Sequence, residues 1–291
     1  MNGALDDLGR VGGLFVWWAT IVSSVSRFEL AFWGSLIVVT LATVGGSLVC
    51  FAMDCSPSLR KYKIQPTRLP TLGHYAKCLK LALLNQFIVH LPVSVAVLHF
   101  GGHLPTFSAA LPLPSFTTIV VELTIFLVCE DTITYWCHRF WHWKAVYKYI
   151  HKVHHEFTAP FGLTAIYTHP IEELTLTLSA LSGPVLFGSH ILCLWLWLFL
   201  RMLDTIEIHS GYEYPLNLKH MVPLLSGASR HDYHHEHFDG NFGSILVVWD
   251  WICRTDTHFR TLQQDKANRG EPASLDLFDH LSSVRSSIKR A

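Results

Sequence analysis

The sequence predicts an all-α integral membrane protein in which transmembrane helical hairpins carry a polar, histidine-rich helical cap on the cytoplasmic side. Three observations support this fold class. Half of the 291 residues are hydrophobic and only 15% are charged, whereas soluble globular proteins carry about 25% charged residues. Several uncharged runs approach the roughly 20 residues that span a hydrocarbon core. The 19 histidines gather mainly in polar stretches between these runs.

Two uncharged runs come first in the chain. Residues 31–53 contain no charged side chain and predict a transmembrane helix. Residues 11–26 are also uncharged but shorter, so they predict either a first span or a helix that lies along the membrane interface. Asp6 and Asp7 occupy the stretch that is positive in a signal peptide, so we do not expect cleavage here.

A basic loop and a second hairpin follow. Residues 54–80 contain six Lys and Arg residues against one acidic residue, and the positive-inside rule places such a loop in the cytoplasm. Residues 81–100 and 116–137 predict two further spans, with a turn marked by the glycines and prolines between them. These two crossings return the chain to the cytoplasmic side.

A last apolar run covers residues 174–200 and is 27 residues long. Two full spans need about 40 apolar residues, and a single span would separate the histidines that follow it from those that precede it. We therefore expect a shallow hairpin that turns near Gly183-Pro184, or a pair of buried helices. Irregular backbone at membrane depth must be covered by protein.

Three histidine clusters carry the chemistry. Their spacings are HxxxH, HxxHH and HxxHH, and their members are His138 and His142, then His151, His154 and His155, then His231, His234 and His235. Because residues three or four positions apart share one face of a helix, we expect each cluster to direct its imidazoles at one point. Eight imidazoles are too many for one ion and suit two. The sequence therefore predicts a di-metal centre in the cap, with no catalytic side chain beyond the metal ligands.

Several known metal-binding motifs are absent from the sequence, and this limits the kinds of metal site that it can form. Imidazole is a ligand for zinc, copper, iron and nickel. The sequence has no CxxC pair of structural zinc sites, no HExxH motif of zinc metalloproteases, and no evident ExxH pair of soluble di-iron bundles. An all-histidine di-metal centre beside a membrane favours oxygen activation.

Other residues near the clusters are candidates for supporting roles. His209 and His169 are further candidate ligands, since small or acidic residues surround them. A nearby carboxylate can accept the second ring N–H of a metal-bound histidine and so orient it. The candidates are Asp131, Glu156, Glu172, Asp204, Glu207 and Asp232, of which Asp131, Asp204, Glu207 and Asp232 are preferred.

Two other functional classes fit the sequence poorly. Lys plus Arg and Asp plus Glu both number 22, and no basic tract is interleaved with aromatic residues, so we expect no nucleic-acid partner. A membrane metal transporter would hold its ligands within the spans, near the bilayer midplane. Here the clusters lie among charged residues such as Arg139, Lys148 and Lys152, which disfavours transport.

The order of the three clusters resembles the fatty acid hydroxylase and sterol desaturase superfamily. Several shorter runs resemble one family within it, the 4-methyl sterol monooxygenases. These runs are YKIQPTR from Tyr62, YKYIHKVHHEF from Tyr147 with APFG from Ala159, HPIE from His169, DTIEIHSGY from Asp204, and NFGS from Asn241. The resemblance is dense over residues 130–260. It departs at Cys253 and Arg254, where the family has an aromatic residue and a glycine.

The resemblance implies a non-haem enzyme with two iron ions, a multi-pass protein of the endoplasmic reticulum membrane whose histidine clusters face the cytoplasm. Such an enzyme oxidises the 4α-methyl group of a 4,4-dimethyl or 4α-methyl sterol stepwise to the carboxylate. It uses dioxygen and electrons from NAD(P)H, relayed by cytochrome b5 and its reductase, and a sterol decarboxylating dehydrogenase acts downstream. The alternative is a sterol desaturase or lipid hydroxylase on the same di-iron scaffold.

The predicted organisation has three parts. Residues 1–137 form membrane-anchoring helices with the basic loop 54–80. Residues 138–260 form a fatty acid hydroxylase-type catalytic domain that includes the apolar hairpin 174–200. Residues 261–291 form a polar cytoplasmic tail.

Overall fold

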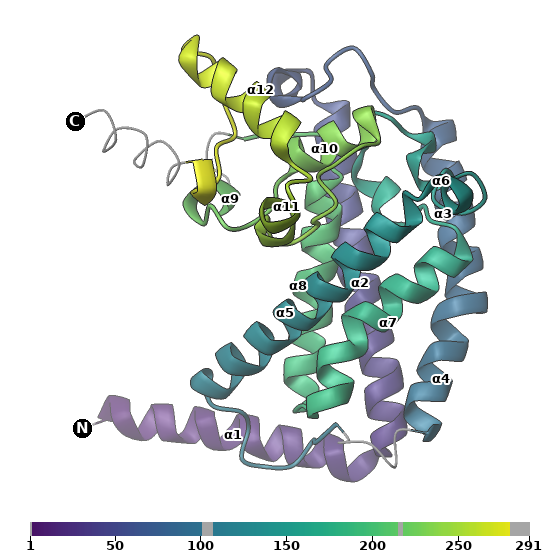
Figure 1. Ribbon diagram of the computed structural model, residues 1–291. Coiled ribbons are helices and arrows are strands. Elements are labelled where there is room, and N and C mark those ends of the chain that lie inside the picture. Colours follow the sequence, from purple (N-terminus) through teal and green to yellow (C-terminus); the bar gives the residue numbers. More distant parts are fainter. Residues whose placement is uncertain (1, 101–106, 215–217, 280–291) are drawn as a thin grey trace.

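A computed structural model describes residues 2–100, 107–214 and 218–279. Within these ranges the chain is helical, and the only β contacts are isolated bridges. Long helices form one body of the molecule, and short helices form a cap at one end of it (Figure 1). The all-α fold class with a histidine-rich cap is therefore confirmed.

The first two helices meet at a sharp corner. Helix α1 covers Asn2–Ser24 and α2 covers Arg27–Cys55. Ser26 begins α2 with a capping box, in which its hydroxyl accepts from the Glu29 N–H while the Glu29 carboxylate accepts from the Ser26 N–H. Figure 1 shows α1 lying across the end of the bundle, whereas α2 runs along it. This arrangement favours the interfacial alternative for residues 11–26.

The predicted span at 81–100 is the C-terminal part of a longer helical segment. Helix α3 (Leu72–Asn85), the π-helical turn η2 (Gln86–His90) and α4 (Leu91–Phe100) follow one another without a break. Among the described residues, Arg27–Cys55 and Leu72–Val97 are the two helices long and apolar enough to cross a membrane. Helix α5 (Phe116–Trp141), where a span was predicted over residues 116–137, is not one of these two, and it runs past residue 137 and so carries its last turn into the cap.

The apolar run 174–200 forms two helices, α7 (Pro170–Phe187) and α8 (Ile191–Ile208). The prediction of a turn near Gly183-Pro184 is wrong, because both residues lie inside α7 and the chain turns at Gly188, where φ is 71°. Gly183 serves packing instead. A Cβ atom there would lie 2.7 Å from the Cα atom of Phe126, so the glycine lets α7 pack closely along α5.

The cap is built from short helices. They are η1 (Pro57–Tyr62), α6 (Lys144–Tyr147), η4 (His154–Glu156), η5 (Gly162–Ile166), α9 (Leu218–Met221), α10 (Ala228–His237), α11 (Val248–Cys253) and α12 (Thr257–Asn268). The buried Arg230 pairs with Asp256 at 3.1 Å and with Asp276 at 2.5 Å. Part of the predicted tail 261–291 therefore packs into the cap, and residues 280–291 lie outside the described residues.

Cys253 and Arg254, which replace an aromatic residue and a glycine of the family, still form a turn at the end of α11. Arg254 follows α11 with a φ of 56°, a left-handed conformation that glycine adopts more readily. Its N–H group donates to the Trp251 carbonyl at 3.3 Å, which closes the helix end.

Replacing Gly183 by alanine should destabilise the protein. The new methyl group would overlap the backbone of α5, and such overpacking costs about 1–3 kcal/mol. The matched control is Gly45→Ala in α2, where a Cβ atom would meet nothing within 4 Å and the better helix former should be neutral or slightly stabilising. Thermal unfolding of the two purified variants in detergent checks this. Equal melting temperatures would contradict the close packing.

Candidate metal centre

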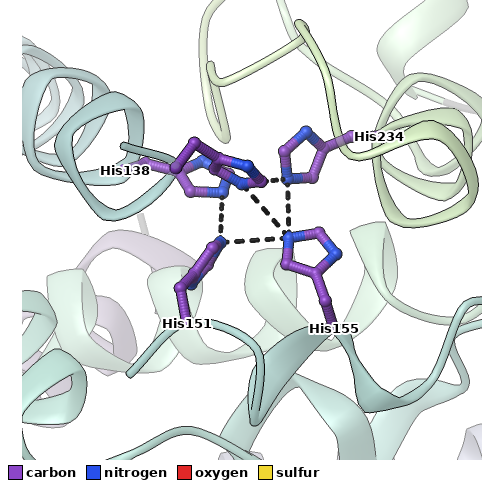
Figure 2. Close-up of side chains that lie close together, drawn as sticks. His138, His151, His155 and His234 are labelled. Carbon is purple, nitrogen blue, oxygen red and sulfur yellow. Dashed lines mark hydrogen bonds between the residues drawn. The ribbon is translucent and has the colours of Figure 1, made fainter. Parts of the chain in front are cut away.

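Nine histidines come together in two groups inside the cap. The first group is His138, His142, His151, His155 and His234, and the second is His154, His209, His231 and His235. Within each group the ligating atoms lie within 4.8 Å of one another. Figure 2 shows rings of the first group converging on a common centre. All eight histidines of the three clusters and His209 are included.

His169 belongs to neither group. It precedes α7 as its N-cap, and its ring nitrogen Nδ1 accepts a hydrogen bond from the Ile171 N–H at 3.2 Å. A histidine can replace Ser or Asp in this capping role, and the sequence alone does not distinguish a cap from a ligand.

Two of the clusters are divided between the groups, contrary to the prediction that each is directed at one point. His151 and His155 enter the first group while His154 enters the second, and His234 separates from His231 and His235 in the same way. In α10 the reason is helical geometry: residues i and i+4 are about 40° apart around the axis, but i+3 and i+4 are about 100° apart. Adjacent histidines therefore face different centres.

The inward-facing atom is Nε2 in both groups. The Nε2 atom of His155 lies 3.0 Å from that of His151 and 3.1 Å from that of His234. In the second group the Nε2 atoms of His231 and His209 are 2.8 Å apart. Two nitrogens bound side by side to one ion, each at about 2.0–2.1 Å, lie about 3 Å from each other. The observed spacing matches that of neighbouring ligands.

In most of the rings the outward-facing atom, Nδ1, is held by an acceptor, whereas Nδ1 of His155 and of His231 has no partner among the described residues. Backbone carbonyls accept from five of the nine rings, which are His138 (Phe242 O, 2.8 Å), His154 (Tyr167 O, 3.3 Å), His209 (Thr205 O, 2.7 Å), His234 (Gly240 O, 2.7 Å) and His235 (Phe157 O, 3.1 Å). A carbonyl can only accept, so Nδ1 carries the proton and Nε2 presents a lone pair. Converging lone pairs repel each other and suit a bound cation, so these residues fit a metal.

Burial keeps the rings neutral. Removal from water, reinforced by the neighbouring imidazoles, lowers the pKa of His154 to about 3 and holds the pKa of His231 well below its usual value. A histidine must be deprotonated at the ligating nitrogen to bind a metal. The site therefore supplies ligands in the binding form at neutral pH.

Among the described residues, one carboxylate forms a hydrogen bond with a grouped histidine, and it is not among the preferred candidates. Glu172, at the start of α7, accepts from Nδ1 of His151 at 2.8 Å. Asp131 instead accepts from the Leu246 N–H, and Asp232 accepts from the Gln65 amide. The remaining candidates pair elsewhere: Asp204 with Arg201, Glu207 at 3.8 Å from Lys219, and Glu156 with Lys77.

An apolar cavity leads away from the histidines between α2, α4, α5, α7 and α8. Its upper wall includes His138, His154, His209 and His231, and its lower wall includes Ala31 and Phe107. Leucines of α7 and α8 line much of the length between them, including Leu176, Leu181, Leu194 and Leu198. The metal groups thus stand at one end of a pocket built largely from the long helices.

The sequence of this chain is similar to those of known proteins. A model of the fatty acid hydroxylase family matches residues 123–255, a stretch that contains all nine grouped histidines. The chain is 39% identical to methylsterol monooxygenase 1 from Danio rerio over 83% of either chain. It is also 39% identical to methylsterol monooxygenase 2-2 from Arabidopsis thaliana, over 86% of this chain and 95% of the relative.

The chain belongs to the methylsterol monooxygenase family. A protein named very-long-chain aldehyde decarbonylase, from Oryza sativa subsp. indica, is 36% identical over 85% of this chain and 93% of its own length. No solved structure matches the chain. Family membership together with the two histidine groups indicates a metal-dependent oxygenase.

Replacing Glu172 by glutamine should weaken metal binding about 10- to 100-fold, the usual cost of losing a partner that orients a metal-bound histidine. The amide is neutral and can turn its NH₂ group toward His151, so it no longer fixes the ring. Elemental analysis after dialysis against graded chelator measures the effect. Glu271→Gln is the control, because Glu271 pairs with Arg269 at the surface. Metal retention like that of the unaltered protein would show that Glu172 does not orient the ligand.

Proposed function

We propose that this protein is a sterol 4-methyl monooxygenase, which oxidises the 4α-methyl group of 4,4-dimethyl or 4α-methyl sterols through alcohol and aldehyde to the carboxylate in sterol biosynthesis. The observation that carries the proposal is the apolar cavity that ends at the two histidine groups, in a chain 39% identical to methylsterol monooxygenases over most of its length. A sterol is nearly all apolar and suits such a cavity.

We propose iron as the metal, with one ion in each histidine group. When bound, the two irons supply the power to activate dioxygen for attack on a methyl C–H bond that offers no acid, base or leaving group. The side chains of the protein bind the metal ions and the sterol and orient them. The nine histidines hold the ions, Glu172 fixes the ring of His151, and the leucine-lined walls position the sterol and exclude water.

Electrons would come from NAD(P)H through a separate protein, which we propose to be cytochrome b5 with its reductase. The cap offers a place for an acidic redox protein, because Lys144, Lys148 and Lys152 are exposed beside the half-buried His142. The carboxylate product is the substrate that a downstream sterol decarboxylating dehydrogenase requires.

Membranes that contain the protein, given a 4,4-dimethyl sterol, dioxygen, NAD(P)H and a reductase system, should yield a product oxidised at the 4α-methyl carbon. Mass spectrometry of the extracted sterols detects it, and purified protein with NAD(P)H alone should give none. A new ring double bond with both methyl groups intact would identify a desaturase instead. Shortening of a long-chain aldehyde, with the sterol untouched, would identify the activity named for the rice relative.

We also propose that the histidine groups face the cytoplasm from the membrane of the endoplasmic reticulum. The basic loop predicted to be cytoplasmic packs on the cap, where the Gln65 amide donates to the Thr158 carbonyl and to Asp232, both at 2.8 Å. Loop and cap must therefore share one side of the membrane.

Single cysteines introduced at two exposed cap positions should react together with a membrane-impermeant reagent added to sealed microsomes. These variants are Lys61→Cys and Lys148→Cys, made with Cys55→Ser to remove an exposed native thiol. Leu111→Cys, exposed at the other end of the bundle, should react only after the membrane is opened. If only Leu111→Cys reacted in sealed vesicles, the cap would face the lumen, contrary to the proposed orientation.

A further inference from the structure

One stripe of helix α5 faces the cavity and ends at the metal groups. Glu130, Thr134 and His138 all line the cavity, and they are spaced four residues apart, one above the other on a single helix face. His138 belongs to the first histidine group. Thr134 is therefore the side chain one turn below a metal ligand, inside the pocket.

The hydroxyl of Thr134 lacks a hydrogen-bond partner within the described chain, although the residue is only 5% exposed. Threonines in helices usually donate to the carbonyl four residues earlier, and Thr43, Thr124 and Thr177 do so here at 2.7–2.8 Å. Thr134 departs from that pattern. A buried polar group without a partner is costly unless a ligand or water supplies one.

A second buried hydroxyl stands beside the same stripe. The chain after α10 runs antiparallel to α5, since the Phe242 carbonyl accepts from His138 and the Leu246 N–H donates to Asp131. Ser244 lies between these two contacts. It lines the cavity, and its buried Oγ atom also lacks a partner among the described residues.

The loop that carries Ser244 is held in place. The carboxylate of Asp250 accepts from the N–H groups of Phe242 and Gly243, each at 2.9 Å. A Cβ atom on Gly243 would lie 2.9 Å from that carboxylate and 2.5 Å from the Leu246 carbonyl. The Ser244 hydroxyl is thus presented by a tight, hydrogen-bonded turn, as a preorganised binding group requires.

We propose that Thr134 and Ser244 together bind the 3-hydroxyl group of the sterol. This inference rests on the proposed function. The 3-hydroxyl oxygen and the 4-methyl carbon sit on neighbouring ring carbons, so a group that holds the hydroxyl must stand next to the metal that attacks the methyl. Thr134, one turn from His138, meets this requirement. The sterol rings then extend along the leucine-lined part of the cavity, away from the histidines.

Several other polar groups of the cavity wall are already engaged in hydrogen bonds. His90 bonds to Glu173 at 2.7 Å and to Gln86 at 3.1 Å. One oxygen of Glu130 and one of Glu172 lack partners, but each carboxylate holds Arg201 or His151 through its other oxygen. A hydroxyl pair also matches an alcohol better than a carboxylate does, because both can donate and accept.

The test compares two sterols on iron-loaded protein in lipid nanodiscs without reductant. Thr134→Val and Ser244→Ala should each bind a radiolabelled 4,4-dimethyl sterol about 10-fold more weakly, the usual effect of one neutral hydrogen bond. Binding of the 3-deoxy analogue should not change. Thr134→Ser keeps the hydroxyl and should bind both sterols like the unaltered protein.

Thr177→Val is the matched control, because Thr177 also lines the cavity but its hydroxyl is already bonded to the Glu173 carbonyl. It should not distinguish the two sterols. Equal loss of both sterols in Thr134→Val, or no loss of either, would overturn the assignment. Failure of the unaltered protein to oxidise the 4-methyl carbon would instead refute the proposed function, while the sterol comparison would still show whether the hydroxyl site exists.

Discussion

Nine imidazoles converge in two groups, most of them with a lone pair facing inward, and this electrostatic constraint organises the rest of the molecule. Like-oriented lone pairs 2.8–3.2 Å apart repel, so each ring must be held from behind. Backbone carbonyls of Phe157, Tyr167, Gly240 and Phe242 do much of this. The irregular segments of the cap are therefore part of the site, since they carry the acceptors that set the tautomer of His138, His154, His234 and His235.

Those segments are in turn fixed by buried charges. Asp250 holds the turn at 242–243 and also accepts from the Thr255 hydroxyl, while Arg230 joins α10 to Asp256 and Asp276. Buried ion pairs add little net stability compared with apolar packing, but they penalise alternative arrangements that would leave a charge unpaired. Here they favour the one arrangement of the cap in which the ring acceptors are correctly placed.

The long helices determine what the centre can reach. Helix α5 packs along α7, and α2 packs along α8, so the return of the chain through α7 and α8 brings His209 and the third cluster back to the end where α5 delivers the first. The same four helices leave an apolar space below the histidines, with α4 completing its wall. The two histidine groups are thus placed at the end of a largely apolar pocket.

The sequence alone determined the helical class, the position of the apolar runs and the eight cluster histidines, because apolar length and the i, i+3, i+4 spacing are local properties of the chain. It also indicated His209, whose role no local pattern distinguishes from that of His169. Tertiary structure decided the rest. The pairing of His154 with His209 rather than with His155, the choice of Glu172 over Asp131 and Asp232, and the turn at Gly188 instead of Gly183 all depend on which segments meet in space. Backbone carbonyls that accept from the rings cannot be recognised from residue types, because every residue has one. The unpartnered hydroxyls of Thr134 and Ser244 can be recognised only in the folded structure, where distant helices enclose the cavity.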